Sequence, residues 1–225
     1  MVMLENTAAQ RLAEIRANIG RAKERFAPLQ ADIELVAVSK TFPAEEIVPF
    51  LDAGQRVFGE NRVQEAKDKW PELKARFPDV SLHLIGPLQT NKVKEAVALF
   101  DVIETLDRER LAEALKVEME RAGRKLRLFV QVNIGLEDQK SGIAPNEAAA
   151  FVERCRSVHQ LDILGLMCIP PAGEAPGPYF AHLAGLAKAA KVEKLSMGMS
   201  ADYEVAIGMG ATHVRVGSAL FGHRI

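Results

Sequence analysis

The sequence alternates eight short apolar segments with segments of helical periodicity, and this alternation limits the choice of fold more than any other feature. The apolar segments span residues 35–40, 56–61, 82–86, 102–106, 126–133, 161–169, 195–199 and 213–217. The helical segments between them are about 10 to 16 residues long, which is typical of βα units. Eight parallel strands are the number that closes a TIM (β/α)8 barrel. We therefore predict a single-domain α/β barrel over residues 1–225.

The two ends of the chain indicate how such a barrel would be completed. Only a few residues follow segment 213–217, so the helix that would cover the last strand is missing there. A helical pattern from about residue 4 to 26, with Leu12, Ile15 and Ile19 on one face, could fill that gap. A doubly wound open sheet is the alternative fold, but no G-x-G-x-x-G motif follows the first strand.

Composition argues against several classes of function. With 29 basic and 30 acidic residues the formal charge is -1, so the chain lacks the positive charge of a nucleic-acid-binding protein. No apolar run approaches the roughly 18 residues of a membrane helix, and no signal-peptide pattern is present. The two cysteines form no CxxC pair, and the histidines show no metal-ligand spacing. We expect a cytoplasmic protein without a metal site, a disulfide framework, or a nucleic-acid or membrane partner.

Chemistry in a barrel of this type gathers at the C-terminal ends of the strands. The first strand ends on Lys40, and a lysine that is half-desolvated at the barrel mouth becomes a nucleophilic amine suited to a Schiff base. A solvated surface lysine is the alternative reading of this position. The other strand ends carry Asn61, His83, Asn133, Met167, Met199, Ser200, Arg215, Gly217 and Ser218.

These strand ends include the groups that pyridoxal 5′-phosphate needs, which makes this cofactor one candidate. The loops after the last two strands often bind phosphate in such barrels, through backbone N–H groups. Here these loops contain Ser200, Gly217 and Ser218. Lys40 would supply an amine, and Arg215 a fixed cation that could face a pyridine nitrogen.

Several motifs resemble those of the YggS/PROSC family, the pyridoxal phosphate homeostasis proteins. The motifs span residues 38–40, 58–65, 83–86 with 88–92, 195–202, and 214–218 with 221–222. They follow one another in order over nearly the whole chain, and their combination is specific although no single motif is. The resemblance implies a barrel like the N-terminal domain of bacterial alanine racemase and a role in vitamin B6 homeostasis.

The resemblance also implies roles for individual residues. Lys40 matches the lysine that forms the Schiff base, and Arg215 matches the arginine near the pyridine nitrogen, which it would keep unprotonated. The residues that match the phosphate-binding loops and the barrel mouth are Ser200, Gly217, Ser218, the backbone of Met199, Asn61 and His83. Pro87 departs from the pattern, since many family members have histidine there.

Whether the protein is an enzyme depends on a second base. A racemase of the related fold places a tyrosine opposite the lysine, from a C-terminal domain of the partner subunit that has no counterpart in this chain. The two tyrosines, Tyr179 and Tyr203, occupy other positions. We expect a monomeric carrier of pyridoxal phosphate, with apo-enzymes as recipients and no robust catalysis. The alternative is an amino-acid racemase with water or Lys40 as its sole base. Lys140 is either solvated or a secondary cofactor contact.

Overall fold

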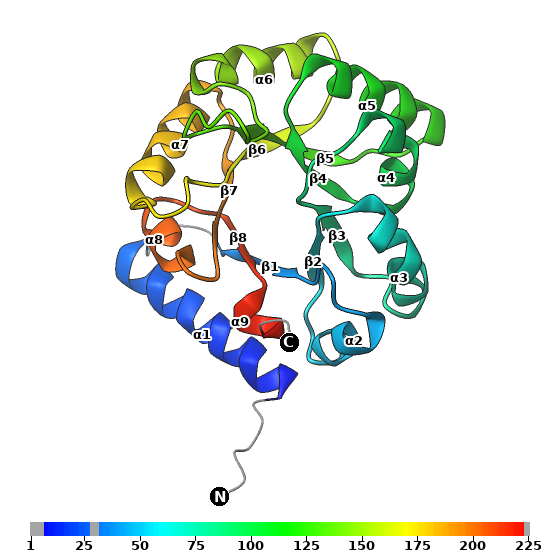
Figure 1. Ribbon diagram of the computed structural model, residues 1–225, viewed down its shortest axis with the longest axis vertical. Coiled ribbons are helices and arrows are strands. Elements are labelled where there is room, and N and C mark those ends of the chain that lie inside the picture. The colour runs from blue at the N-terminus through cyan, green and yellow to red at the C-terminus, as the bar shows by residue number, and fades with distance from the viewer. Residues whose placement is uncertain (1–6, 28–31, 223–225) are drawn as a thin grey trace, which may run out of the picture.

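The computed structural model describes residues 7–27 and 32–222, and in these residues eight parallel strands form a closed barrel (Figure 1). The strands are β1 (Glu34–Val38), β2 (Val57–Glu60), β3 (Ser81–Leu84), β4 (Val102–Leu106), β5 (Arg127–Val132), β6 (Ile163–Cys168), β7 (Lys194–Met199) and β8 (His213–Val216). Strand β1 pairs with both β2 and β8, which closes the sheet. The predicted TIM barrel is confirmed.

Helices surround the barrel in Figure 1. They are α1 (Ala8–Phe26), α2 (Ala44–Asp52), α3 (Val63–Arg76), α4 (Val93–Leu99), α5 (Glu109–Ala122), α6 (Ala148–Ser157), α7 (Gly177–Ala189), α8 (Tyr203–Gly208) and α9 (Ser218–Phe221), with 3-10 turns η1 (Thr90–Lys92) and η2 (Pro145–Glu147). Helix α3 passes through Pro71 and ends just before Pro78. None of the helices in the described part of the chain is long and apolar enough to cross a membrane.

Helix α1 covers the barrel between α8 and α2. Its N-terminus is fixed by a capping box between Thr7 and Gln10, which satisfies two backbone N–H groups. It packs beside α8 and α9 (Figure 1), with Leu12, Ile15 and Ile19 buried. The predicted gap-filling role is therefore confirmed, whereas residue 4 of the predicted helix lies outside the described residues. The short helix α9, which the sequence did not indicate, follows β8.

Side chains alternate between the two faces of each strand and build two separate layers. On the outer face, Phe58 of β2 packs against Trp70 of α3, with ring centroids 5.1 Å apart. On the inner face, Val102, Phe129 and Met167 form a small apolar cluster apart from the core that the strands share with the helices. Because Val102 begins β4, this cluster lies toward the N-terminal end of the barrel interior.

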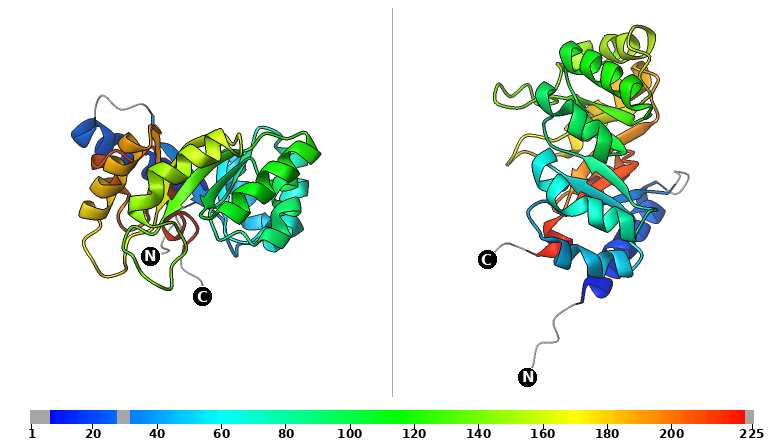
Figure 2. Two further views of the ribbon diagram at one scale, coloured as in Figure 1. Left: turned by 90° about the horizontal axis from the view of Figure 1, so that it is seen from above. Right: turned by 90° about the vertical axis from the view of Figure 1, so that its right-hand side faces the viewer.

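The loops after β5 and β6 are the longest projections of the barrel. Both views of Figure 2 show these two loops, in green and yellow, extending from the same side of the molecule. Since each loop follows a strand, this side is the C-terminal end of the barrel, where barrel enzymes and binding proteins place their chemistry.

Candidate functional site

Lys40 lies in a turn directly after β1, at the C-terminal rim of the barrel. Its side chain is exposed, so the half-desolvation expected from the sequence is not found. The next residue, Thr41, has a φ of 70°, which is rare for a β-branched residue and costs about 1–3 kcal/mol. Such strain persists only where neighbouring groups hold the backbone, and it is common at functional sites.

Lys69 of α3 holds the turn that carries Lys40. Its Nζ donates hydrogen bonds to the first and last carbonyl oxygens of turn 39–42, at 3.0 and 2.9 Å. Glu65, one helical turn earlier, accepts from the backbone N–H of Thr41 and from Lys69 Nζ. These charge-assisted contacts clamp both sides of the turn and offset the strain at its centre.

Glu60, at the end of β2, supports the same turn from the outer face of the barrel. It is fully buried, and its Oε1 accepts hydrogen bonds from Ser39 Oγ at 2.6 Å and Trp70 Nε1 at 3.0 Å. Lys69 Nζ also lies 3.0 Å from this oxygen. Burial raises the pKa of Glu60. This effect outweighs the charge of Lys69 and these hydrogen bonds, which lower the pKa. The rim at β1 and β2 is thus built from a buried polar cluster.

A second buried carboxylate, Glu104 of β4, organises the polar side chains inside the barrel. Its Oε1 lies 2.7 Å from Nδ1 of His83 on β3, and its Oε2 accepts from Ser196 Oγ of β7 at 2.6 Å. Arg215 of β8 donates from Nη1 to the same Ser196 hydroxyl at 2.7 Å and from Nη2 to the Cys168 carbonyl at 2.9 Å. The guanidinium Nη1 lies 3.9 Å from Glu104 Oε2.

The charges in this interior balance one another. Burial alone would raise the pKa of Glu104, but the hydrogen bond and charge of His83, the charge of Arg215 and the Ser196 hydroxyl lower it to about 2. Burial lowers the pKa of His213 to about 4, so its ring is neutral at pH 7. Glu104 is fully buried and Arg215 is 4% exposed, so each is the counter-charge that makes burial of the other tolerable.

Asn61, at the end of β2, offers an unused acceptor to the barrel mouth. Its Oδ1 is buried and has no hydrogen-bond partner among the described residues. Gly86 packs directly against the Asn61 backbone, since a Cβ at position 86 would lie 2.1 Å from the Asn61 carbonyl oxygen. The neighbouring Pro87 is exposed. A buried acceptor without a partner is costly, and it is typical of a position that a ligand donor completes.

Backbone N–H groups converge after β7 and β8, where the sequence predicts phosphate binding. The N–H groups of Gly217 and Ala219 point to Ser200 Oγ, at 3.2 and 3.5 Å. Gly217 lies against β1, because a Cβ there would be 3.3 Å from Val38 Cβ. The converging N–H groups therefore lie next to the strand that leads to Lys40.

Ser218 and Met199 are the remaining predicted residues of these loops. Ser218 is exposed and begins α9. Met199, at the end of β7, has an exposed side chain, and its backbone N–H donates to Asp202 Oδ1 at 2.6 Å. The N–H group of Met199 thus has a partner within its own loop, and its part in phosphate binding, which the resemblance implies, stays a prediction.

Asn133 and Lys140, which the sequence analysis considered, form contacts in the long loops after β5 and β6. Asn133, at the end of β5, donates from Nδ2 to the Glu137 carbonyl oxygen at 2.9 Å and accepts from the Glu137 N–H at 3.1 Å. Lys140 is half-buried, pairs with Glu137 and donates to the Pro170 carbonyl oxygen at 2.9 Å. Lys140 therefore ties the loop after β5 to the loop after β6, and it is not simply solvated.

Sequence reasoning missed Glu104, Ser196 and Lys69. A signal was present for Glu104, since it is the one acidic residue within the apolar segment 102–106. An acid inside a strand that is buried on both faces requires partners. Nothing in the sequence shows that Ser196 and Arg215 are those partners, because they lie on strands across the barrel.

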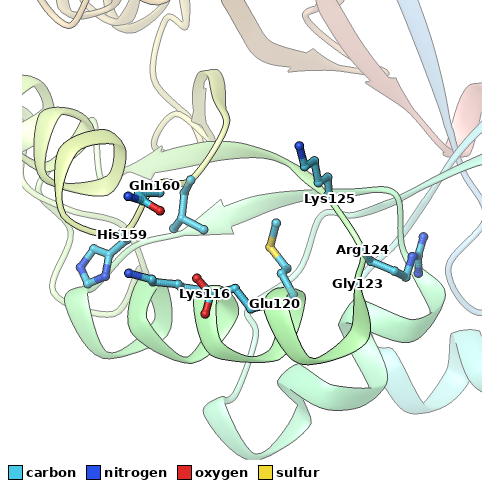
Figure 3. Close-up of a pocket in the computed structure, with 9 residues that line it drawn as sticks. Lys116, Glu120, Gly123, Arg124, Lys125, His159 and Gln160 are labelled. Atoms are coloured by element: carbon cyan, nitrogen blue, oxygen red, sulfur yellow. The ribbon is translucent and has the colours of Figure 1, made fainter.

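A further pocket, of about 410 Å³, lies at the opposite end of the barrel, where α5 leads into β5 and α6 leads into β6 (Figure 3). Two of the side chains that line it, Arg124 and His159, have partners among the described residues. Arg124 contacts Asp101 and the Val97 carbonyl oxygen, and His159 Nε2 lies 2.8 Å from Glu109 Oε1. Arg124 and His159 thus connect the loops after α5 and α6 to neighbouring helices, and we place the candidate site at the other end.

The groups at the C-terminal end fit a small ligand with an electrophilic carbon, an anionic group and an acceptor. An exposed amine at Lys40, the N–H groups of Gly217 and Ala219, and the buried cation of Arg215 lie on the adjacent strands β1 and β8 or directly after them. In the described part of the chain, no three His, Cys, Asp or Glu residues are grouped so that they could hold a metal ion.

Comparison with known proteins identifies the family. The alanine racemase N-terminal domain family matches residues 10–225. The curated pyridoxal phosphate homeostasis protein of Pasteurella multocida is 37% identical over 228 residues, covering 97% of this chain and 98% of that protein.

Solved structures agree with this relationship. PipY of Synechococcus elongatus PCC7942 with PLP bound is 39% identical, has a TM-score of 0.82, and is matched over 96% of this chain and 100% of its own. An alanine racemase of Clostridium difficile 630 has a TM-score of 0.73 at 17% identity, over 98% of this chain and 57% of its own, which is a likeness of fold alone. The chain therefore belongs to the alanine racemase N-terminal domain family and, within it, to the pyridoxal phosphate homeostasis proteins.

Proposed function

We propose that this protein binds pyridoxal 5′-phosphate reversibly at the C-terminal end of its barrel and thereby acts in vitamin B6 homeostasis. One observation carries the proposal: Lys40, the N–H groups at Ser200 and the guanidinium of Arg215 are brought together by the pairing of β8 with β1. The names of the curated relatives and the PLP bound to PipY support it.

The bound cofactor would supply an aldehyde for covalent attachment and an electron-withdrawing ring. Lys40 Nζ is the amine that binds the aldehyde, and its clamped turn fixes where that amine can reach. The N–H groups of Gly217 and Ala219, with the Ser200 hydroxyl, bind the phosphate. Asn61 Oδ1, which has no partner among the described residues, would accept a hydrogen bond from the cofactor at the rim. His83 lies deeper in the barrel, on β3.

Arg215 favours storage of the cofactor over catalysis. A guanidinium donates hydrogen bonds but does not give up its proton at ordinary pH, so it leaves the ring nitrogen opposite it unprotonated. An unprotonated ring withdraws fewer electrons from a bound amino acid. Reversible binding without efficient turnover follows from this pairing, and delivery to apo-enzymes is the use that we propose for it.

The two tyrosines also favour a carrier. The hydroxyl of Tyr179, in the first turn of α7, donates at 2.5 Å to Glu174 in the loop after β6. Tyr203 is buried in the packing of α8 against the barrel. Neither is therefore placed as a second base that could complete proton exchange on an amino acid.

The Lys40→Ala variant tests the covalent attachment. We expect the wild-type protein, after incubation with pyridoxal phosphate, to show a visible absorption band that borohydride converts into a pyridoxyl-lysine on the Lys40 peptide. The Lys40→Ala variant loses both, because no other amine takes its place. The control Lys67→Ala changes an exposed lysine of α3 and should keep the band and the modified peptide. A wild-type protein without any band would contradict the proposal.

Proton exchange separates a carrier from a racemase. The loaded protein is incubated with L- and D-alanine in heavy water, and α-deuterium incorporation is followed by NMR. We expect exchange no faster than with the same concentration of free cofactor, because the hydroxyl of Tyr179 is bound to Glu174 and Tyr203 is buried, so neither tyrosine is free to act as a second base. Multiple turnovers that disappear in Lys40→Ala would instead make the protein an enzyme.

The Lys69→Met variant tests the clamp on the Lys40 turn. Methionine keeps much of the length of the side chain but cannot donate to the two carbonyl oxygens of turn 39–42. We expect cofactor binding to weaken by about tenfold, since part of the binding free energy is then spent on ordering the turn. Titration of the absorption band measures this. Lys67→Met, two residues earlier and exposed, should bind normally, and equal affinities of the two variants would exclude the clamp.

A further inference from the structure

Glu104 spans the interior of the barrel. Strand β4 lies opposite β8 in the closed sheet, yet Glu104 is 3.9 Å from the Arg215 guanidinium and hydrogen-bonded to Ser196 of β7 and His83 of β3. It is fully buried, so none of these interactions is weakened by water. A single side chain thus connects β4 to one neighbouring strand and to two strands on the far side.

The hydrogen bonds between these groups have a fixed direction. Glu104 is ionised, so Ser196 must donate its only hydroxyl proton to the carboxylate and accept from Arg215 through a lone pair. Arg215 Nη2 is held by the Cys168 carbonyl. Two bonds on different nitrogens fix the plane of the guanidinium, and further N–H donors of Arg215 have no partner among the described residues. They are available to a ligand above.

Packing alone does not account for a carboxylate here. Two residues earlier on the same face of β4, Val102 fills the barrel interior with Phe129 and Met167. An apolar residue at position 104 would extend this cluster, and a buried ion pair is often no more stable than apolar residues of similar volume. Glu104 and its polar partners lie instead toward the C-terminal ends of the strands, where the candidate site is.

We propose that Glu104 is a positioning residue for Arg215: it fixes the guanidinium beneath the cofactor ring through Ser196 and supplies the negative charge that balances it. This inference rests on the proposed function, since it concerns how the same site controls the bound cofactor. The negative charge of Glu104 then sets the electrostatic potential inside the barrel. Through this potential it also sets the pH range over which the bound cofactor keeps its visible band.

The groups that act on this potential are few. Glu104 faces His83 from β3 and Arg215 and His213 from β8, with the uncharged Ser196 from β7. His213 is neutral at pH 7 and therefore adds no positive charge. Glu104 is ionised and is the negative charge that opposes Arg215 among these groups. Removing that charge makes the interior more positive and disfavours a protonated, cationic form of the bound cofactor.

The test compares Glu104→Gln and Ser196→Ala with the wild type. Asp101→Asn is the control, because Asp101 directly precedes β4 and pairs with Lys74 and Arg124 at the other end of the barrel. Each protein is loaded with pyridoxal phosphate, and its visible band is recorded against pH. In Glu104→Gln we expect the loss of the band to move to lower pH by about one unit. Asp101→Asn should match the wild type.

A second readout needs no cofactor. In the unloaded protein, ¹⁵N NMR of the arginine side chains reports how freely each guanidinium rotates. We expect separate, slowly exchanging Nη signals for Arg215 in the wild type, and averaged signals in both Glu104→Gln and Ser196→Ala. A merely structural role would change the melting temperature without changing either readout.

The experiments distinguish a failure of the inference on Glu104 from a failure of the proposed function. If the wild type traps no cofactor with borohydride, the proposed function itself fails. If it does, and both variants keep the wild-type pH profile and the wild-type Arg215 signals, Glu104 does not position Arg215. Should Glu104→Gln fail to fold, Ser196→Ala decides by the NMR readout, because it removes one oxygen and leaves the charge of Glu104 in place.

Discussion

The pairing of the last strand with the first is the constraint on which the site depends. In the register of β1 and β8, Val36 lies beside Arg215 and Ala37 beside Val216. Gly217 therefore lies against Val38, and the amine of Lys40 shares one rim with the N–H groups after β8. An open sheet would separate these groups by its whole width, so closure of the barrel and assembly of the site are the same event.

Closure also creates an interior in which charges must be balanced. Arg215 is buried, and burial of a cation requires a counter-charge. Glu104 provides it from the opposite wall, with Ser196 between them. The rim follows a similar logic, since Lys69 and Glu60 are buried around the turn that presents Lys40. In both places a buried ion pair supports a residue that we propose to contact the cofactor.

The sequence predicts the fold well because the information is local. Each apolar segment and each helical segment can be recognised from its own periodicity, and their number indicates the barrel. The exposed turn at Lys40 depends instead on neighbours in space such as Lys69, and the expected burial of Lys40 is wrong.

The candidate site is only partly predictable for a related reason. Strand ends indicate Lys40 and Arg215, but the partners of Arg215 are 19 residues away at Ser196 and across the barrel at Glu104. Such pairings depend on the register and tilt of strands that no single segment encodes. The hydrogen bond from the Met199 N–H to Asp202 within the loop after β7 is likewise revealed only by the structure.

A crystal structure of the protein grown with pyridoxal phosphate would show directly whether these residues bind the cofactor. We expect electron density continuous with Lys40 Nζ and a phosphate within hydrogen-bonding distance of the Gly217 and Ala219 N–H groups. We also expect the ring nitrogen to face Arg215 while Arg215 stays bonded to Ser196. Cofactor bound elsewhere, for example in the pocket beside α5, or a ring that does not face Arg215, would contradict the proposal.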